Sequence, residues 1–273
     1  MFKKKLLALL LACTTVFSMV GCSSNESKEE AKEPETEKVL RVGVSASYNP
    51  WCYKDGEEIV GIDVDVLKEA AKRMGDYKVE FQVASFDGMF GLLDAGKVDI
   101  VANQITVTPE REEKYKFSEV YAYNPYSLVV RKDDNSINSL EDLKGKTFVG
   151  KAAGSEVAFI ESYKKENDPN DEIKIMTVDE DEETAVAQGK GDAIGYPTTS
   201  FQQLLDESGL ELKIVGDTIF EETNAYPFKK DADEELYNKF NEAIKSMKED
   251  GFLADLYNKY LGIDISKPST ENK

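Results

Sequence analysis

The sequence contains no histidine and only three cysteines among its 273 residues. The absence of histidine excludes Ser–His and Cys–His catalytic pairs, His-ligated metal sites and a histidine pH switch. The cysteines, at positions 13, 22 and 52, do not form the C-x-x-C spacing typical of zinc and iron–sulfur sites. We therefore expect no metal and no cofactor.

Basic residues are scarce compared with acidic ones. The chain has 34 lysines and arginines against 53 aspartates and glutamates, a net charge of −19. So acidic a protein is a poor partner for nucleic acid or for an anionic membrane surface. Its hydrophobic content of 41% is enough for a folded core, and its length fits one large domain or two smaller ones.

The N-terminal segment has the pattern of a secretory signal. Basic residues at 3–5 precede an apolar run from Leu6 to Val20, which is too short and too interrupted for a confident transmembrane helix. The run ends in Val20-Gly21-Cys22, which resembles the lipobox of bacterial lipoproteins. The resemblance implies a signal peptide at 1–21 and acyl chains, palmitate among them, on Cys22, which would anchor the protein to the membrane. The alternative is a chance cysteine after an ordinary signal peptide.

Residues 23–38 contain no large apolar side chain. Such a segment cannot bury enough surface to offset the entropy of ordering, so residues 22–38 are predicted to be the lipidated cysteine and a flexible acidic tether. The alternative, a helix rich in Glu and Lys, is disfavoured by Pro34.

From residue 39 onward, strand and helix patterns alternate twice, which predicts an α/β fold with parallel strands. The segment Gly96–Val101 resembles Gly189–Ile194 in sequence and in position, so we expect two lobes of similar build. Strands are predicted at 39–44, 78–83, 98–102, 147–150, 173–178 and 192–195. Helices are predicted at 62–74, 86–93, 140–143, 157–165, 182–188, 232–250 and 253–261.

Four segments carry a resemblance to a known family: GIDVDVLKEAAKRMG (61–75), SFDGMFGLLDAGKVDIVANQITVTPEREEKYKFSEVY (85–121), LEDLKGKTFVGKAAGS (140–155) and KEDGFLADLYNKYLG (248–262). They resemble the family 3 extracellular solute-binding proteins, the polar amino-acid-binding lipoproteins of ABC importers. The resemblance implies a two-lobed periplasmic-binding-protein type II fold, with two βαβ-type lobes joined by two hinge strands near 121–125 and 221–226. It implies lobe I at 39–123, lobe II at 124–223, a return segment of lobe I at 224–266 and a tail at 267–273.

The same resemblance implies a monomeric binding protein on the extracytoplasmic face of the membrane, which delivers an amino acid to an ABC permease. An enzyme is the rival interpretation, because relatives of this fold include cyclohexadienyl dehydratases. Acid–base catalysis would need a carboxylate in the cleft, and Pro197 stands at the obvious position for one. We therefore do not expect an enzyme.

Arg111 is the strongest candidate for ligand binding. A guanidinium can pair bidentately with the carboxylate of a zwitterionic amino acid. Thr108 is a plausible helix N-cap and Pro109 a plausible first helical residue, so the carboxylate would also face a helix N-terminus. The family's carboxylate-binding arginine falls at this position. The alternative is a surface arginine paired with Glu110 or Glu113.

Thr106 and Gln104 lie in the same loop, which the family uses to bind the ligand's carboxylate and amine. The pair Asn103-Gln104 resembles the cystine-binding branch of the family, and side-chain amides would suit a long ligand with a second polar end. Asn103 has a simpler alternative role, as the cap of a strand end.

Aromatic side chains are expected around the ligand. Tyr48 and Phe86 fall where the family places aromatic walls, and Trp51 and Tyr53 crowd the same loop as Tyr48. Because that loop also packs onto the sheet, a purely structural role is the alternative for Trp51 and Tyr53.

The second lobe is expected to contribute Lys151, Ala153 and Ser155, which follow a strand. Ser155 would begin a helix and meet the ligand carboxylate from across the cleft. The family commonly has an aspartate after a later strand to hold the ligand's amine, but Pro197 aligns there. Neutral contacts could come from Tyr196, Thr198 and Thr199, whereas Asp192 is expected to be structural.

These features favour cystine or a related sulfur amino acid as the ligand, with glutamine or another polar amino acid as the alternative. A basic ligand is disfavoured because none of the residues expected around its side chain is acidic. Cys52 is expected to be a buried small hydrophobe, with thiol exchange on a disulfide ligand as the alternative.

Overall fold

A computed structural model describes residues 38–75, 77–152, 154–179 and 181–269. The predicted signal peptide, Cys22 and nearly all of the tether lie outside these residues, as does the end of the predicted tail. Within the described part of the chain, no helix is long and apolar enough to cross a membrane.

The first lobe is built on a five-stranded sheet with the order β5-β1-β6-β13-β7. Its strands are β1 (Val39–Val44), β5 (Lys78–Val83), β6 (Ile100–Ala102), β7 (Tyr115–Phe117) and β13 (Pro227–Lys229). Strands β5, β1 and β6 are parallel, and β13 joins them antiparallel. A small antiparallel sheet in the same lobe contains β2 (Ser47–Tyr48), β3 (Cys52–Asp55) and β4 (Glu58–Val60).

The second lobe is built on a sheet with the order β10-β9-β11-β8-β12. Its strands are β8 (Ala122–Arg131), β9 (Thr147–Gly150), β10 (Lys174–Thr177), β11 (Ala193–Pro197) and β12 (Leu212–Asn224). The described helices are α1 (Ile62–Arg73), α2 (Phe86–Asp94), α3 (Pro109–Lys114), the 3₁₀ turn η1 (Leu140–Leu143), α4 (Ser155–Asn167), α5 (Glu182–Ala187), α6 (Phe201–Ser208), α7 (Glu234–Glu249) and α8 (Phe252–Leu261).

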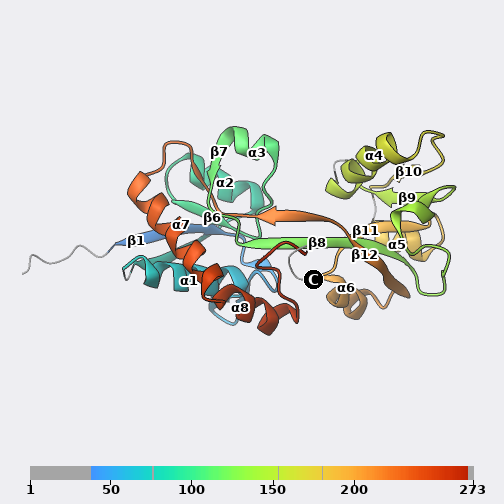
Figure 1. Ribbon diagram of the computed structural model, residues 1–273. Helices are drawn as coiled ribbons and strands as arrows, with labels where there is room; N and C mark the ends of the chain where they lie inside the picture. The colour runs from blue at the N-terminus through green and yellow to red at the C-terminus, as the bar shows by residue number, and fades with distance from the viewer. Residues whose placement is uncertain (1–37, 76, 153, 180, 270–273) are drawn as a thin grey trace, which may run out of the picture. The chain divides into compact units, whose positions relative to one another are not determined.

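The long strands β8 and β12 connect the two lobes (Figure 1). They pair antiparallel, from Ala122 opposite Asn224 to Arg131 opposite Leu212. At one end, Asn224 forms a β-bridge with Thr106 of the first lobe. This paired ribbon is the connection about which two lobes of this kind can move.

A repeated contact supports the internal similarity predicted from the sequence. In the first lobe, Asp99 accepts a hydrogen bond from the Arg41 backbone N–H at 2.8 Å. In the second, Asp192 accepts one from the Thr147 backbone N–H at the same distance. Each aspartate precedes a strand and fixes it to its parallel neighbour, so the structural role predicted for Asp192 is confirmed.

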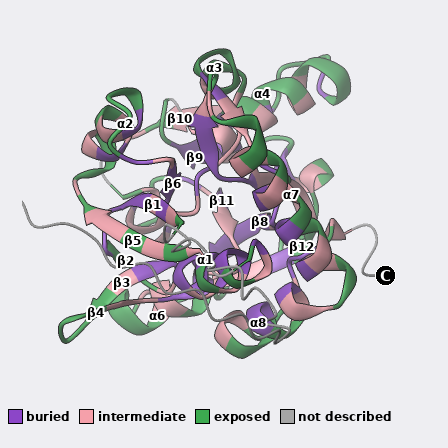
Figure 2. Cartoon of the chain, turned by 90° about the vertical axis from the view of Figure 1, so that its left-hand side faces the viewer, coloured by how far each residue is buried: buried purple, intermediate pink, exposed green. Residues whose placement is uncertain are grey.

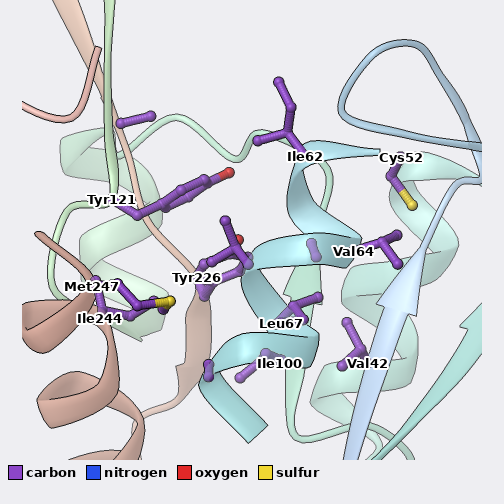
Figure 3. Packing of buried hydrophobic residues seen from close by; sticks show 14 of the residues in the cluster. Val42, Cys52, Ile62, Val64, Leu67, Ile100, Tyr121, Tyr226, Ile244 and Met247 are labelled. Carbon is purple, nitrogen blue, oxygen red and sulfur yellow. The ribbon is translucent and has the colours of Figure 1, made fainter. Parts of the chain in front are cut away.

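The main core lies in the first lobe, between its sheet and helices α1, α7 and α8. Figure 3 shows the rings of Tyr121 and Tyr226 beside α1; their centroids are 4.4 Å apart. Gly61 allows α1 to start against the preceding loop, because its φ is 124° and a Cβ there would lie 2.5 Å from the Trp51 carbonyl oxygen. In Figure 2, buried residues follow strands such as β8 and β9, whereas the outer surface of α4 is largely exposed.

Candidate ligand-binding site

The loop that follows β6 is held in place by a buried carboxylate. The backbone N–H of Gln104 donates to Asp63 Oδ2 at 2.9 Å, and Gln104 itself has a positive φ of 49°. Asp63 is fully buried and also accepts hydrogen bonds from the hydroxyls of Tyr121, at 2.6 Å, and Tyr226, at 3.0 Å. Burial raises the pKa of Asp63 to about 6, although these three hydrogen bonds act in the opposite direction.

The side chain of Gln104 reaches a residue that was predicted to form an aromatic wall. The Tyr48 hydroxyl donates to Gln104 Oε1 at 2.9 Å. On the other side of the loop, Asn224 Nδ2 donates to the Gln104 carbonyl at 3.3 Å and to Thr106 Oγ1 at 3.4 Å. The structure therefore brings Tyr48, Gln104 and Thr106 together at the end of the connecting strands.

Arg111 lies beside this loop in the manner that its sequence predicts. Thr108 Oγ1 accepts from the Arg111 N–H at 3.3 Å, and Pro109 is the first residue of α3, so the predicted cap is present. The Arg111 guanidinium donates to the Thr106 carbonyl at 2.8 Å and lies 5.6 Å from the centre of the Phe86 ring. Arg111 forms no ion pair with a carboxylate in the part of the chain that the structure describes, so its remaining donors can serve an anion.

A carboxylate that the sequence analysis missed joins the two lobes at this point. Glu222 of β12 accepts from Thr106 Oγ1 at 3.2 Å and from Ser155 Oγ at 2.6 Å. Ser155 is the first residue of α4, as predicted. The sequence analysis predicted a hinge strand near 221–226 but named no binding residue in it. The signal that could have revealed Glu222 is the alternation of side chains along a strand, which places every second residue on the same face.

A cavity of about 690 Å³ lies between the lobes. From the first lobe it is lined by Ser47, Tyr48 and Asn49, and from the second by Tyr126, Glu156, Glu182, Glu183, Gly195, Tyr196, Pro197, Ser200, Gln203, Leu204 and Glu207. Burial, followed by the charges of Glu183 and Glu182, raises the pKa of Tyr196 to about 12. A smaller cavity of about 410 Å³ includes Arg111, Phe86 and Thr108.

The acidic lining corrects one argument from the sequence. The glutamates 156, 182, 183 and 207 all line the larger cavity. Burial, and then the charges of neighbouring glutamates, raise the pKa of Glu156, although hydrogen bonds from backbone N–H groups lower it. The argument against a basic ligand considered only the residues expected around its side chain, and it left out these glutamates, which line the same cavity as Tyr48.

Trp51 is the clearest correction among the candidate residues. Its side chain is 2% exposed and belongs to the core, where its ring packs against Tyr121 and Tyr257 with centroid distances of 6.3 Å. It is thus part of the first-lobe core and does not line the cavity, because its loop folds onto α1. Tyr53 is half-buried in β3 and also does not line it.

Several other candidates are occupied by contacts within the protein. Asn103 accepts a hydrogen bond from the Ser45 hydroxyl, which fits the alternative role of fixing a strand end. The Lys151 ammonium lies 3.6 Å from Glu182. Thr198 contacts the Pro125 carbonyl, and Thr199 donates to Asn124 Oδ1 at 2.7 Å, so both face the connecting strand β8. Ala153 lies outside the described residues.

The comparisons with known proteins decide the family. Residues 40–263 match the model for bacterial extracellular solute-binding proteins, family 3. The chain belongs to this family. It is 36% identical to the probable amino-acid-binding protein YxeM of Bacillus subtilis, with 97% of each chain covered.

Two further relatives from Bacillus subtilis have named ligands. The arginine-binding extracellular protein ArtP is 35% identical, with 94% of this chain and 98% of the relative covered. The L-cystine-binding protein TcyA is 33% identical, with 97% and 100% covered. The structure of the L-cystine solute receptor of Neisseria gonorrhoeae in the unliganded open conformation superimposes with a TM-score of 0.68 at 28% identity, over 85% of this chain and 96% of that one. The predicted family and two-lobed fold are thereby confirmed.

Proposed function

We propose that this protein is the amino-acid-binding component of an ABC uptake transporter, and that it closes its two lobes around one zwitterionic amino acid. The observation that carries the proposal is the placement of the Arg111 guanidinium. One of its nitrogens donates to the Thr106 carbonyl at 2.8 Å, and its other N–H groups remain free to pair with a ligand carboxylate. Its neighbours Thr106 and Ser155 come from different lobes and meet through Glu222. A ligand placed here would contact both lobes.

Closure follows from such a two-lobe site. A ligand that binds the closed arrangement more tightly than the open one shifts the population toward closure. The closed protein would present its two lobes to a permease, and ATP would be hydrolysed by that membrane complex. We propose no enzymatic step for this chain, which we expect to act as a monomer.

The location follows from the N-terminal pattern and the family. We propose that Cys22 carries acyl chains, including palmitate, which hold the protein on the extracytoplasmic face of the cell membrane. The acidic segment up to residue 38 would separate the binding lobes from the bilayer.

Cystine is the first candidate for the ligand. Asn103 and Gln104 resemble the cystine-binding branch, and several relatives are L-cystine-binding proteins. A cationic amino acid is the second candidate, because four glutamates line the cavity between the lobes and one relative is an arginine-binding protein. Glutamine remains an alternative among the neutral amino acids.

Calorimetric titration of the chain from residue 23 onward tests the function and separates these ligands. The probes are L-cystine, L-glutamine, L-arginine and L-citrulline, which replaces the guanidinium of arginine with a neutral group of similar shape. Arginine binding much more tightly than citrulline would identify a cationic ligand, whereas cystine binding most tightly would support the first candidate.

Thermal unfolding with each of the twenty amino acids and cystine extends the test to other ligands. A ligand at a hundred times its Kd adds about 2.7 kcal/mol to the free energy of unfolding. A protein that responds to none of these compounds would contradict the proposed function. Turnover of prephenate or arogenate would instead support the enzyme interpretation.

A further inference from the structure

Glu222 is a carboxylate of the connecting strands that two hydroxyl groups, one from each lobe, hold in place. It lies on β12, opposite Asn124 of β8, so it belongs to the connecting ribbon. Each of its carboxylate oxygens receives one hydroxyl: Oε2 from Thr106 at 3.2 Å and Oε1 from Ser155 at 2.6 Å. No lysine or arginine among the described residues forms an ion pair with it.

These hydrogen bonds decide what the cluster can bind. A carboxylate only accepts hydrogen bonds, so each hydroxyl must use its single hydrogen to donate to Glu222. Thr106 Oγ1 also receives Asn224 Nδ2 at 3.4 Å. The two hydroxyls can then offer only lone pairs to anything else, and the cluster of Thr106, Ser155 and Glu222 presents acceptors and one negative charge.

An ammonium group matches this arrangement, because it has three donors, no acceptor and a positive charge. A ligand carboxylate does not match it, because it would meet lone pairs and the charge of Glu222. Arg111, which donates to the Thr106 carbonyl, supplies the donors that a carboxylate needs. The two ends of a zwitterion thus have separate partners, one at the side chain of Thr106 and one at its backbone carbonyl.

We propose that Glu222 receives the α-ammonium of the amino-acid ligand, together with the hydroxyls of Thr106 and Ser155. The inference rests on the proposed function and assigns the charge partner that Pro197, at the end of β11, does not supply. It also changes the predicted role of Ser155 from a carboxylate donor to an ammonium acceptor, and it assigns the Thr106 hydroxyl, whose loop was expected to bind both ends of the ligand, to the amine. Because the two hydroxyls come from different lobes, the ammonium would link both lobes to the connecting strand.

Pairs of probes that differ only in their α-ammonium groups, one in arginine and glutamine and two in cystine, test this assignment. The pairs are L-arginine with 5-guanidinopentanoic acid, L-cystine with 3,3′-dithiodipropionic acid, and L-glutamine with glutaramic acid. Binding of each pair is measured by calorimetry on the wild type, on Glu222→Gln and on Glu221→Gln. The last variant is a matched control, since Glu221 is the neighbouring residue and its carboxylate accepts the Ser269 N–H at 2.7 Å instead.

We expect the wild type to bind each amino acid about thirtyfold or more tightly than the des-amino partner of that amino acid, because the buried ammonium pairs with a carboxylate. The comparison applies to every amino acid of the three that the wild type binds. This preference should fall to within about threefold in Glu222→Gln and persist in Glu221→Gln. Glu222→Asp keeps the charge and should retain part of the preference, which separates a loss of charge from a loss of folding.

Two results would overturn the assignment while leaving the proposed function intact. One is unchanged binding of the amino acid by folded Glu222→Gln. The other is tighter binding by that variant, which would show that Glu222 competes with the ligand's carboxylate for Thr106 and Ser155. If the wild type binds none of the three amino acids, the assignment falls together with the function on which it rests.

Discussion

The backbone N–H of Gln104 donates to Oδ2 of Asp63 at 2.9 Å, so a buried carboxylate of α1 fixes the loop that carries Thr106. An asparagine at position 63 would place its amide nitrogen either opposite this N–H or at the position of Oδ1, to which the hydroxyls of Tyr121 and Tyr226 both donate. We expect the variant to bind its amino acid more weakly, because the loop loses this anchor.

Asp63 also has a predictable pH signature. Its pKa is raised from 3.8 to about 6 by burial, so folding takes up a proton between these values. The contribution of Asp63 to stability is therefore most favourable below pH 3.8 and declines as the pH rises to about 6. The free energy of unfolding of the wild type, minus that of Asp63→Asn, should fall by up to about 3 kcal/mol over this interval. Chemical denaturation of both proteins at several pH values measures it, and a difference that is constant or rises with pH would contradict the raised pKa of Asp63.

Arg111 provides the most direct test of the carboxylate site. Arg111→Ala should weaken binding of the amino acid by at least about a hundredfold, since the ligand's carboxylate would lose a charged partner. Arg111→Lys is the matched control for charge: it keeps the cation but loses the planar fork, so it should recover only part of the affinity. Both variants should unfold within a few degrees of the wild type, and unchanged affinity in Arg111→Ala would remove this residue from the site.

Cys52 is expected to be unreactive in the folded protein. Its side chain is fully buried, and burial raises the pKa of the thiol to about 12, so little nucleophilic thiolate forms near neutral pH. In the chain from residue 23, a disulfide reagent such as Ellman's reagent should modify this thiol only after denaturant is added. Rapid modification of the native protein, or a mixed disulfide formed with L-cystine, would instead support a redox role.

Cys22 tests the proposed anchor independently of the binding site. Cys22→Ser in the full chain should move the protein from the membrane fraction into the medium or periplasm, because the acyl attachment point is removed. Fractionation followed by immunoblotting measures this. A serine variant that stays with the membrane would argue against lipidation at Cys22.

Local patterns in the sequence predicted the regular elements well. The strand at Val39–Val44 and the 3₁₀ turn at Leu140–Leu143 lie where they were expected, and α1 runs from Ile62 to Arg73 within the predicted 62–74. The sequence analysis did not predict the small sheet β2–β4, α6, or β7 and β13. It also named the connecting strands only as crossover points. The missed strands have two to four residues, which is too short for an alternating pattern to stand out.

The site was predicted in part, for a physical reason. Arg111 and its Thr108 cap form a local motif, which a short stretch of sequence can reveal. Glu222 meets Thr106 across 116 positions of the chain and Ser155 across 67, so only the fold brings them together. The burial of Trp51 likewise depends on how its loop packs against Tyr121, which no local pattern encodes.

The central claim is that one amino acid is held by both lobes and that its binding closes them. The distance between the lobes therefore tests it.

Helices α3 and α4 belong to different lobes and lie on the same side of the β8–β12 ribbon (Figure 1). Each of them has an exposed glutamate, Glu113 in α3 and Glu161 in α4. In the chain from residue 23, replacing both with Cys in a Cys52→Ala background allows iodoacetamide spin labels to report the interlobe distance by pulsed EPR. With L-cystine or L-arginine, whichever the protein binds, at a concentration that just saturates the wild type, the account predicts a shift to a shorter distance. At that same concentration it predicts little or no shift when Arg111→Ala is added. A distance distribution that stays unchanged while the ligand is bound would contradict it.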